Sequence, residues 1–208
     1  MAPSLPSQAD ALIFDLFGVI VAFDDELVYQ RIAQRCADPV AATEYMANLV
    51  SAPSLICGHI SLNQIHAQLV ESLSLDASLD EFEGLWMSSY SEPMPGMRDL
   101  LHQLTHECKL VLLSNVDRYY WRTVESSIPE LQGFHAKVLS FQEGVAKPNA
   151  LAFKRAIAAS GTTVERCYFV DDKPENTDAA AKVGLASHTF QNCRLLKEAL
   201  RGLGLRVA

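Results

Sequence analysis

Short runs of apolar residues recur along the chain and predict buried strands. The first run, Ala11–Phe14, has four apolar residues and is followed directly by Asp15. Runs without polar alternation are typical of parallel strands that are covered on both faces of a sheet. Four later runs have the same character: Lys109–Leu113, Lys137–Leu139, Cys167–Val170 and Ala186–Thr189.

Helical periodicity fills the intervals between the later runs. It predicts helices over Met97–Thr105, Ala150–Ala159 and Pro174–Val183. Pro174 suits the first turn of the last helix, and Gly184 suits the position just past its end. Strands that alternate with helices favour an α/β fold, a Rossmann-like parallel sheet with helices on both faces.

One long segment breaks this alternation. Residues 23–91 have helical periodicity and no strong strand run. We therefore expect an all-helical cap inserted after the first strand, with residues 1–22 and 92–208 forming the α/β core. The helices expected in the cap are Glu26–Cys36, Ala41–Val50, Ser61–Leu73 and Leu79–Ser88.

The composition narrows the class of protein. The chain has 208 residues, of which 49% are hydrophobic and 20% charged, as in a globular domain with a small insertion. Its 17 basic and 25 acidic residues give a net charge of −8, which argues against nucleic acid and anionic membranes as partners. Five cysteines without C-x-x-C spacing predict free thiols. The lack of a basic N-terminal region and of a bilayer-spanning run predicts a cytoplasmic protein.

Polar residues follow four of the predicted strands. The carboxyl ends of parallel strands meet at one edge of a sheet, where ligands of such folds bind. Each cluster alone is explained as well by a helix cap, a turn or a loop, but four in this order predict a common site. The clusters are Asp15, Ser114-Asn115, Lys147-Pro148 and Asp171-Asp172.

The chemistry of these side chains is complementary. Three carboxylates in one crevice repel one another strongly unless a cation lies between them. Mg²⁺ suits such a site, because it takes one or two carboxylates and completes its shell with water and phosphate oxygens. The Lys147 ammonium and the Ser114 hydroxyl can hold a phosphate group, and Asp15 can attack it as a nucleophile.

Four motifs resemble those of the haloacid dehalogenase superfamily of hydrolases. The resemblance extends from Ala11 to about Gln191. Within the superfamily, the segment Gly58–Ser61 and the Asp-Asp-x-x-x-Asn pattern of this chain resemble two subgroups. These are the phosphatases of the α-D-glucose-1-phosphate type and the N-terminal phosphatase domain of soluble epoxide hydrolases. The motifs are Ile13–Val19, Leu112–Asn115, Ala146–Pro148 and Phe169–Asn176.

The resemblance implies a role for each motif residue. Asp15 would form an aspartyl-phosphate, and Lys147 would neutralise the charge of the nucleophile and the phosphate. Asn176 would orient the carboxylates of the fourth motif. The implied phosphate-binding residues are Leu16, Ser114, Asn115 and Lys147. The implied Mg²⁺ site consists of Asp15, the main-chain carbonyl of Phe17, Asp172 and, directly or through water, Asp171.

Phe17 departs from the family pattern, because most phosphatases of the superfamily have a second aspartate at this position as the general acid and base. Three explanations are open. The substrate has a good leaving group such as an anomeric phosphate, or the cap supplies the acid, or the activity is weak. The cap candidates for the acid are His59, His66 and Glu71.

We therefore expect a Mg²⁺-dependent phosphatase of a small phosphorylated metabolite, a sugar phosphate such as glucose 1-phosphate, as a monomer or a homodimer. The first alternative is a 2-haloacid dehalogenase, because those enzymes have an aromatic residue at the position of Phe17. They need no metal, however, and would leave Asp171 and Asp172 without a cation. The second alternative is a non-catalytic member that binds a phosphate ligand or a regulatory partner.

Overall fold

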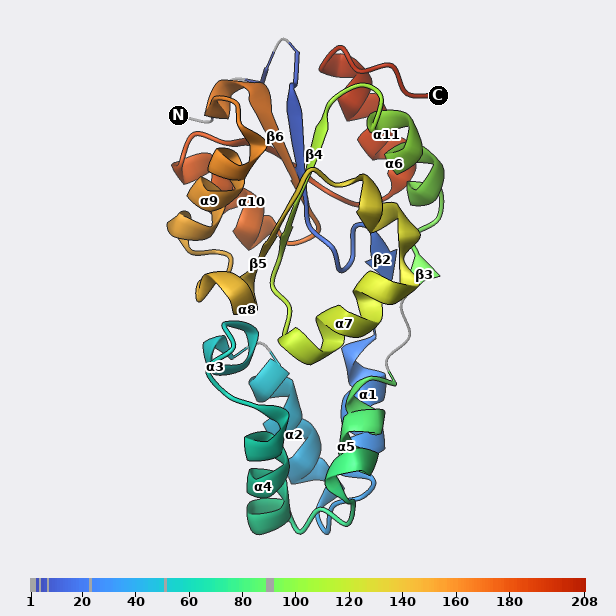
Figure 1. Ribbon diagram of the computed structural model, residues 1–208, viewed down its shortest axis with the longest axis vertical. Helices are drawn as coiled ribbons and strands as arrows, with labels where there is room; N and C mark the ends of the chain where they lie inside the picture. The colour runs from blue at the N-terminus through green and yellow to red at the C-terminus, as the bar shows by residue number, and fades with distance from the viewer. Residues whose placement is uncertain (1–2, 4, 7, 23, 51, 89–91) are drawn as a thin grey trace.

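The computed structural model describes residues 3, 5–6, 8–22, 24–50, 52–88 and 92–208. Its centre is a five-stranded parallel sheet in the order β5-β4-β1-β6-β7 (Figure 1). All five predicted strands are present, within one residue of their expected ends. They are β1 (Ala11–Phe14), β4 (Lys109–Ser114), β5 (Ala136–Leu139), β6 (Cys167–Asp171) and β7 (Ala186–Thr189).

Strand β1 lies in the middle of the sheet. Its last residue, Phe14, is in register with Leu112 of β4 and with Val170 of β6. All four residues of β1 are fully buried, which explains the uninterrupted apolar run in the sequence. The residue after this strand, Asp15, therefore emerges between the ends of two neighbouring strands.

Helices cover both faces of the sheet, as predicted. Ala11 and Ile13 of β1 pack in a cluster with α9 and α10 on one face, whereas Leu12 and Phe14 pack with α6, α7 and α11 on the other. The bounds of these helices are α6 (Met97–Leu104), α7 (Arg118–Ser127), α9 (Ala150–Ser160), α10 (Pro174–Lys182) and α11 (Cys193–Gly202).

Several elements were not predicted from the sequence. Helix α7 is mostly polar in sequence and buries only Tyr120, Trp121 and Val124. The other elements that were missed are short or lie near the C-terminus. They are β2 (Val21–Ala22), α3 (Pro53–Ile56), β3 (Glu92–Pro93), the 3₁₀ helices Pro129–Gly133 and Val164–Arg166, α8 (Ser140–Glu143) and α11.

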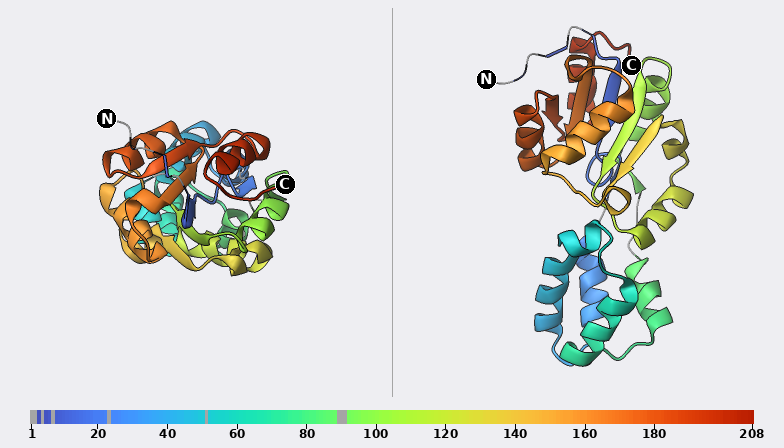
Figure 2. Two further views of the ribbon diagram at one scale, coloured as in Figure 1. Left: turned by 90° about the horizontal axis from the view of Figure 1, so that it is seen from above. Right: turned by 60° about the vertical axis from the view of Figure 1, so that its left-hand side comes forward.

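The helices described between β2 and β3 pack around a hydrophobic cluster of their own. They lie beyond the carboxyl ends of the sheet strands, at the opposite end of the molecule from the chain termini (Figures 1 and 2). The expected boundary residues of this segment, Phe23 and Ser91, lie outside the described residues. The helices are α1 (Asp25–Ala33), α2 (Pro39–Val50), α3, α4 (Leu62–Leu73) and α5 (Leu79–Trp86).

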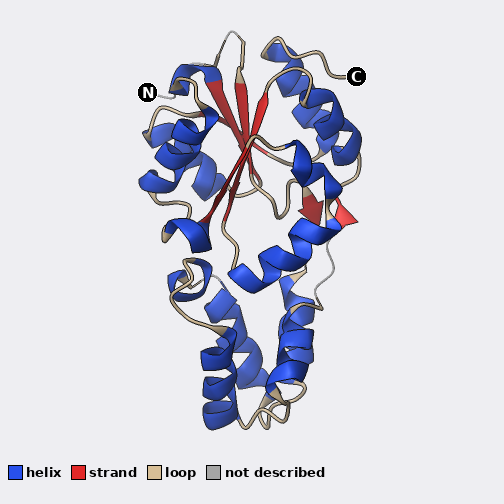
Figure 3. Cartoon of the chain, viewed as in Figure 1, coloured by secondary structure: helices blue, strands red, loops and turns tan. Residues whose placement is uncertain are grey.

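The chain enters and leaves this helical segment through two strands that lie side by side. Val21 of β2 is opposite Pro93 of β3 in a short antiparallel ribbon, separate from the main sheet (Figure 3). Within the segment, Ser61 and Ser78 each close a capping box that starts α4 and α5. In the described part of the chain, no helix combines the length and the apolar character that a membrane span needs.

Candidate active site

The four polar clusters converge at the carboxyl edge of the sheet. Asp15 follows β1, Ser114 ends β4 and Asp171 ends β6. Because β1 pairs with both β4 and β6, the ends of these three strands are adjacent. Lys147 comes from the loop after α8 and reaches the same place.

Lys147 is the centre of a buried ion-pair network. Its Nζ lies 2.7 Å from Asp15 Oδ1 and 2.7 Å from Asp171 Oδ2. The main chain of Lys147 is held by Asn115, whose amide side chain accepts from the Lys147 N–H and donates to the Lys147 carbonyl, both at 2.8 Å. Burial alone would lower the pKa of Lys147, but the two carboxylates raise it, so the ammonium stays charged.

Asp171 has a partner on each of its carboxylate oxygens. Besides Lys147, it accepts hydrogen bonds from the Asn176 amide at 2.9 and 3.1 Å and from the Lys173 N–H at 2.9 Å. Burial opposes ionisation of this carboxyl, but the ammonium and these donors together hold its pKa below the ordinary value. Asp171 is thus a fixed anion that orients Lys147, with Asn176 orienting Asp171 in turn.

Asp15 shares the same lysine but has fewer donors. Its Oδ1 accepts from the N–H of Leu16 at 2.7 Å. Burial, together with the nearby charge of Asp171, raises the pKa of Asp15 to about 7 against the opposing effect of Lys147. Without a further cation, the carboxylate form of Asp15 is therefore incompletely compensated.

Asp172 marks where such a cation fits. Its Oδ1 is buried, and no described residue donates a hydrogen bond to it. Burial and the charge of Asp171 raise its pKa. Oxygens of Asp15, Asp171 and Asp172 all lie within 4.8 Å of one another. An all-oxygen set with one orphaned carboxylate oxygen suits a hard divalent cation such as Mg²⁺.

Gly18 gives this carboxylate its space. A Cβ built on Gly18 would lie 2.5 Å from Asp172 Oδ2, and the glycine has φ +77°, a conformation that other residues rarely adopt. The first motif therefore needs glycine here for both backbone conformation and clearance.

Ser114 has the second orphaned polar atom of the site. Its Oγ is fully buried, and no described residue lies within hydrogen-bond distance of it. A buried hydroxyl without a partner is unfavourable unless a ligand supplies one. The atom is suited to donate to an anionic group held between Asp15 and Lys147.

Phe17 has an apolar role in this structure. Its ring packs against Tyr120 with a centroid separation of 5.5 Å and lines the cavity beside Gly18. No titratable side chain of the first motif other than Asp15 is therefore directed to the site.

A cavity of about 620 Å³ is lined by several of these residues, among them Phe17, Lys147 and Asp172. One of its walls is the sheet edge, and the other comes from α1, α2, α3 and α5. Its lining residues are Phe17, Gly18, Asp24, Glu26, Val28, Tyr29, Val50, Leu55, Ile56, Trp86, Asn115, Asp117, Tyr120, Lys147, Pro148, Asp172, Lys173 and Glu175.

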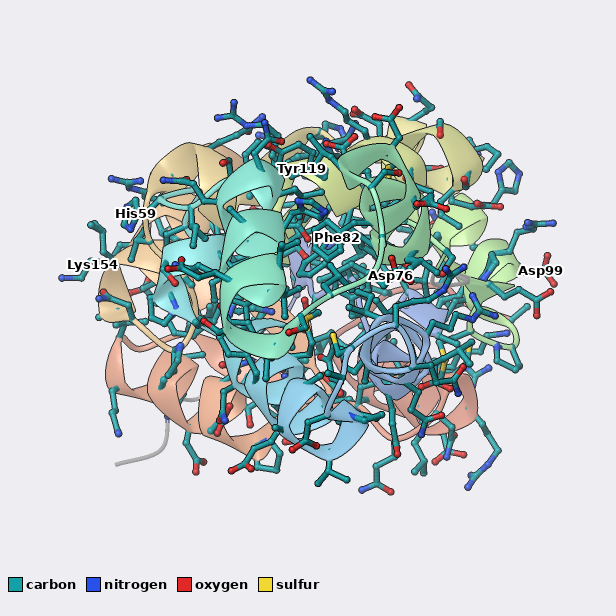
Figure 4. All side chains as sticks on the ribbon, turned by 90° about the horizontal axis from the view of Figure 1, so that it is seen from below. His59, Asp76, Phe82, Asp99, Tyr119 and Lys154 are labelled. Carbon is teal, nitrogen blue, oxygen red and sulfur yellow. The ribbon has the colours of Figure 1, made fainter. Side chains whose placement is uncertain are left out.

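The three acid candidates of the helical segment do not line this cavity. His59 and Glu71 are exposed, and Figure 4, which views the helical end, shows His59 near the margin of the molecule. His66 has its Nε2 2.8 Å from the Ala77 carbonyl, and its ring packs on Phe82. These contacts hold His66 within the helical segment, where it has a structural role and does not line the cavity.

Two residues that join the walls of the cavity, Asp117 and Trp86, are among those not singled out from the sequence. Asp117 caps α7, and its Oδ2 lies 3.4 Å from Nε1 of Trp86 in α5, which joins the two walls. Asp117 could have been suspected from the sequence, because it lies three residues after Ser114, near the end of a predicted strand. Nothing in the sequence pointed to a role for Trp86 in the cavity, because only the fold brings it near Asp117, 31 positions later.

The sequence model of the haloacid dehalogenase-like hydrolases matches residues 9–184. Flavin mononucleotide hydrolase 1 of Arabidopsis thaliana is 25% identical to this chain over 145 residues. The aligned part covers 68% of this chain and 58% of that protein, so the chain spans little more than half of the curated relative.

Solved structures share the fold at low sequence identity. A haloacid dehalogenase-like hydrolase from Porphyromonas gingivalis has a TM-score of 0.79 at 23% identity, covering 93% of this chain and 98% of its own. A family enzyme from Bacteroides thetaiotaomicron, in complex with magnesium and inorganic phosphate, has a TM-score of 0.74 at 20% identity, covering 89% and 96%. L-2-haloacid dehalogenase from Xanthobacter autotrophicus has a TM-score of 0.62 at 16% identity, covering 96% and 85%.

Proposed function

The chain belongs to the haloacid dehalogenase-like hydrolase family, and from this membership and its site we propose that it is a Mg²⁺-dependent phosphomonoesterase that acts through an aspartyl-phosphate. The orphaned carboxylate oxygen of Asp172 beside Asp15 is the observation that carries the proposal. It supports a divalent cation at the sheet edge, and a cation there favours a phosphate ester as the ligand. The solved relative with bound magnesium and phosphate agrees with this proposal.

Asp15, the Phe17 carbonyl and Asp172 would hold the Mg²⁺, with Asp171 acting through Lys147 and water. The bound cation would withdraw electron density from the phosphoryl oxygens and compensate the charge of the two ligating carboxylates. Because the donors around Asp171 already engage both of its oxygens, Asp172 is the better direct ligand of the pair.

In the first step, an oxygen of Asp15 attacks phosphorus. The bond between phosphorus and the ester oxygen breaks, and its electron pair leaves with the alcohol oxygen. Lys147 favours the ionised form of Asp15 and orients it. The Ser114 hydroxyl and the Asn115 main chain would bind the phosphoryl oxygens, joined by the Leu16 N–H, which without substrate donates to Asp15 Oδ1. In the second step, water attacks phosphorus, and the bond between phosphorus and the Asp15 oxygen breaks with its electron pair returning to the carboxylate. The proton that water loses balances the one that the alkoxide takes from solvent, so alcohol, inorganic phosphate and free Asp15 result.

The leaving group must depart beside Phe17, an apolar ring. An alcohol oxygen of low pKa leaves more readily without a proton donor, so we propose an ester with a good leaving group. An anomeric sugar phosphate such as glucose 1-phosphate fits this requirement and remains the candidate substrate. Flavin mononucleotide belongs in the same screen, because it gives the Arabidopsis relative its name.

The dehalogenase alternative has a structural relative, the Xanthobacter enzyme with chloropropionic acid covalently bound. Against it, a metal-independent enzyme would leave the buried Oδ1 of Asp172 uncompensated. The non-catalytic alternative is disfavoured because Asp15, Lys147 and Asp172 are all present and close together.

Further features stay proposals. We propose that residues 23–91 act as a cap over a core of residues 1–22 and 92–208. A cytoplasmic location, a monomeric or homodimeric state and the absence of nucleic-acid or membrane partners are predictions from the sequence.

The experiment is hydrolysis of an aryl phosphate and of 2-chloropropionate by the same preparation, with Mg²⁺ and with EDTA. We expect phosphate release that requires Mg²⁺ and no chloride release. Chloride release in EDTA would instead establish the dehalogenase, and neither product would favour the non-catalytic alternative. A panel of phosphorylated metabolites then ranks the substrates.

A further inference from the structure

Among the described residues, those that line the cavity carry more negative than positive charges. Of the charged residues that line the cavity, Lys147 is held between Asp15 and Asp171, and Lys173 follows Asp172 at the phosphate end. The remaining charged lining residues are carboxylates: Asp24, Glu26, Asp117 and Glu175, besides Asp172.

Asp117 is the carboxylate fixed most firmly in this lining. Its Oδ1 accepts from the N–H groups of Tyr119 and Tyr120 at 2.8 and 3.0 Å, so the start of α7 sets its position. Its Oδ2 has one long contact, 3.4 Å from Nε1 of Trp86. This oxygen therefore keeps capacity to accept a hydrogen bond from a bound molecule.

Most of the other residues that line the cavity are apolar or aromatic. Trp86, Val28 and Leu55 come from the helical segment, and Phe17 and Tyr120 come from the sheet side. Such surfaces cover sugar rings, alkyl groups and aromatic rings well, and aromatic faces also attract cations. A second anionic group would lose its hydration here and meet like charges instead of donors.

We propose that this cavity selects the phosphate ester by charge. It accepts monoesters whose leaving group is uncharged or cationic, and it rejects esters with a second phosphate or a carboxylate. Where the leaving group has a hydrogen-bond donor, that donor binds Asp117 Oδ2. The inference rests on the proposed phosphatase function and specifies its substrate class. Independent of the carboxylates, the cavity itself and the unpartnered Oγ of Ser114, the residue before the lining residue Asn115, indicate that a ligand binds here.

Burial is consistent with this role, because it raises the pKa of Asp117 against its hydrogen bonds from α7 and Trp86. A donor or a cation from the ligand would lower the cost of keeping that carboxylate ionised. Asp24 and Glu26 on the helical segment are exposed and extend the same sign of charge toward solvent.

The first test uses two sugar phosphates that share the reacting group. Glucose 1-phosphate and glucuronic acid 1-phosphate differ by one carboxylate far from phosphorus. We expect wild-type kcat/KM to favour the neutral ester at least about tenfold, because like charges at short range in a site of low dielectric repel strongly. Equal values, or a preference for the glucuronate, would overturn the proposal.

The second test separates charge from shape. Phosphocholine and 3,3-dimethylbutyl phosphate have leaving groups of nearly the same shape, but only the first carries a positive charge. Because the ammonium also lowers the pKa of the leaving alcohol and so raises the rate, the comparison uses KM, and we expect the KM of phosphocholine to be no higher than that of the uncharged ester. A KM for phosphocholine tenfold or more above that of the uncharged ester would contradict the acceptance of cations.

Asp117→Asn tests the residue. Asparagine keeps the side-chain oxygen that caps α7, so the fold is expected to persist, which thermal unfolding checks. The preference for glucose 1-phosphate over glucuronic acid 1-phosphate should fall at least threefold, and the KM of phosphocholine relative to that of the uncharged ester should rise. An unchanged preference in the folded variant would remove Asp117 from the selection.

Glu198→Gln is the matched control. It removes the same charge from the exposed surface of α11, where Glu198 pairs with Arg194 and does not line the cavity. Both substrate ratios should stay at wild-type values. Activity on the neutral esters with no charge preference refutes this inference alone, whereas no Mg²⁺-dependent release from any ester refutes the proposed function, and the inference falls with it.

Discussion

The two walls of the cavity are built on different principles. At the sheet edge, charged groups hold one another, and Lys147 joins Asp15 to Asp171 at 2.7 Å on each side. The helical wall presents side chains such as Val28 and Trp86, which its own hydrophobic cluster holds in place. Its polar links to the sheet side include Trp86 with Asp117 and the Ile56 carbonyl with the Ser140 hydroxyl.

This contrast separates chemistry from selection. A change among the coupled charges of Asp15, Lys147 and Asp171 should affect every substrate, whereas a change at Phe17 or Asp117, which line the cavity from the sheet side, should act like one in the helical wall. A change in the helical wall alters contacts with the leaving group, so it should affect substrates unequally. The predictions below test the division, beginning with the largest expected effect.

The division predicts first that Asp15→Asn abolishes turnover of all esters, by at least about 10⁴-fold in kcat. The amide is a poor nucleophile and a weaker Mg²⁺ ligand, while its size preserves the packing. Phosphate release at saturating Mg²⁺ measures the loss, and circular dichroism checks the fold. A folded variant with the wild-type rate would exclude the covalent mechanism.

Asp172→Ala and Ser114→Ala should separate the metal site from the phosphate site. Loss of Asp172 removes a direct metal oxygen, so the Mg²⁺ concentration at half-maximal activity should rise at least about tenfold. Loss of Ser114 removes one hydrogen bond to a charged group, worth roughly 1.5–3 kcal/mol, so kcat/KM should fall while the Mg²⁺ midpoint stays near that of the wild type. Equal midpoints in both variants would mean that the metal ligands are misassigned.

Phe17→Asp should narrow the gap between good and poor leaving groups. Wild type should prefer glucose 1-phosphate over glucose 6-phosphate, because no carboxyl stands beside the leaving oxygen. General acid catalysis is typically worth about 10²–10⁴-fold, so even partial function of the new carboxyl should reduce the preference by about tenfold. The comparison uses kcat/KM for both esters, with Phe17→Leu as the control without a titratable group. A wild-type preference for the 6-phosphate would count against this account.

The smallest expected effect is on stability without metal. The folded-state pKa of Asp15 is raised to about 7, whereas an ordinary Asp titrates at about 4. The contribution of Asp15 to the free energy of unfolding of the wild type therefore falls as the pH rises from about 4 to 7, and it stays low above pH 7. Asp15→Asn has no such loss, although Lys147 keeps only Asp171 as its carboxylate partner. In EDTA at pH 8, the variant should therefore have a Tm a few degrees above wild type.

The pH dependence supplies the check on this last prediction. The difference in Tm between variant and wild type should shrink as the pH falls from 7 to 4, because Asp15 then becomes protonated in the folded wild type. A variant that is less stable than wild type at pH 8 in EDTA would show that the buried carboxylate is already compensated without a cation.

Much of the fold was predictable because its signals are local. Ala11–Phe14 is apolar throughout since both faces of β1 are covered, and the polar residue after it marks the strand end. Parallel strands place such ends at one edge, so the sequence alone was enough to group Asp15, Ser114 and Asp171. The mostly polar α7 and the short α3 and α8 lack such apolar runs and were missed.

The residues of the sheet edge could therefore be predicted from the sequence, whereas the contacts between them could not. The sequence by itself determined that carboxylates, a lysine and a serine would meet at the ends of buried strands, because strand burial and chain order imply it. Only the tertiary structure decided that Asn115 clamps the main chain of Lys147 and that Trp86 reaches Asp117. The physical reason is that both contacts join segments about 30 residues apart. The contact of Trp86 with Asp117 also depends on how two separately packed hydrophobic clusters meet.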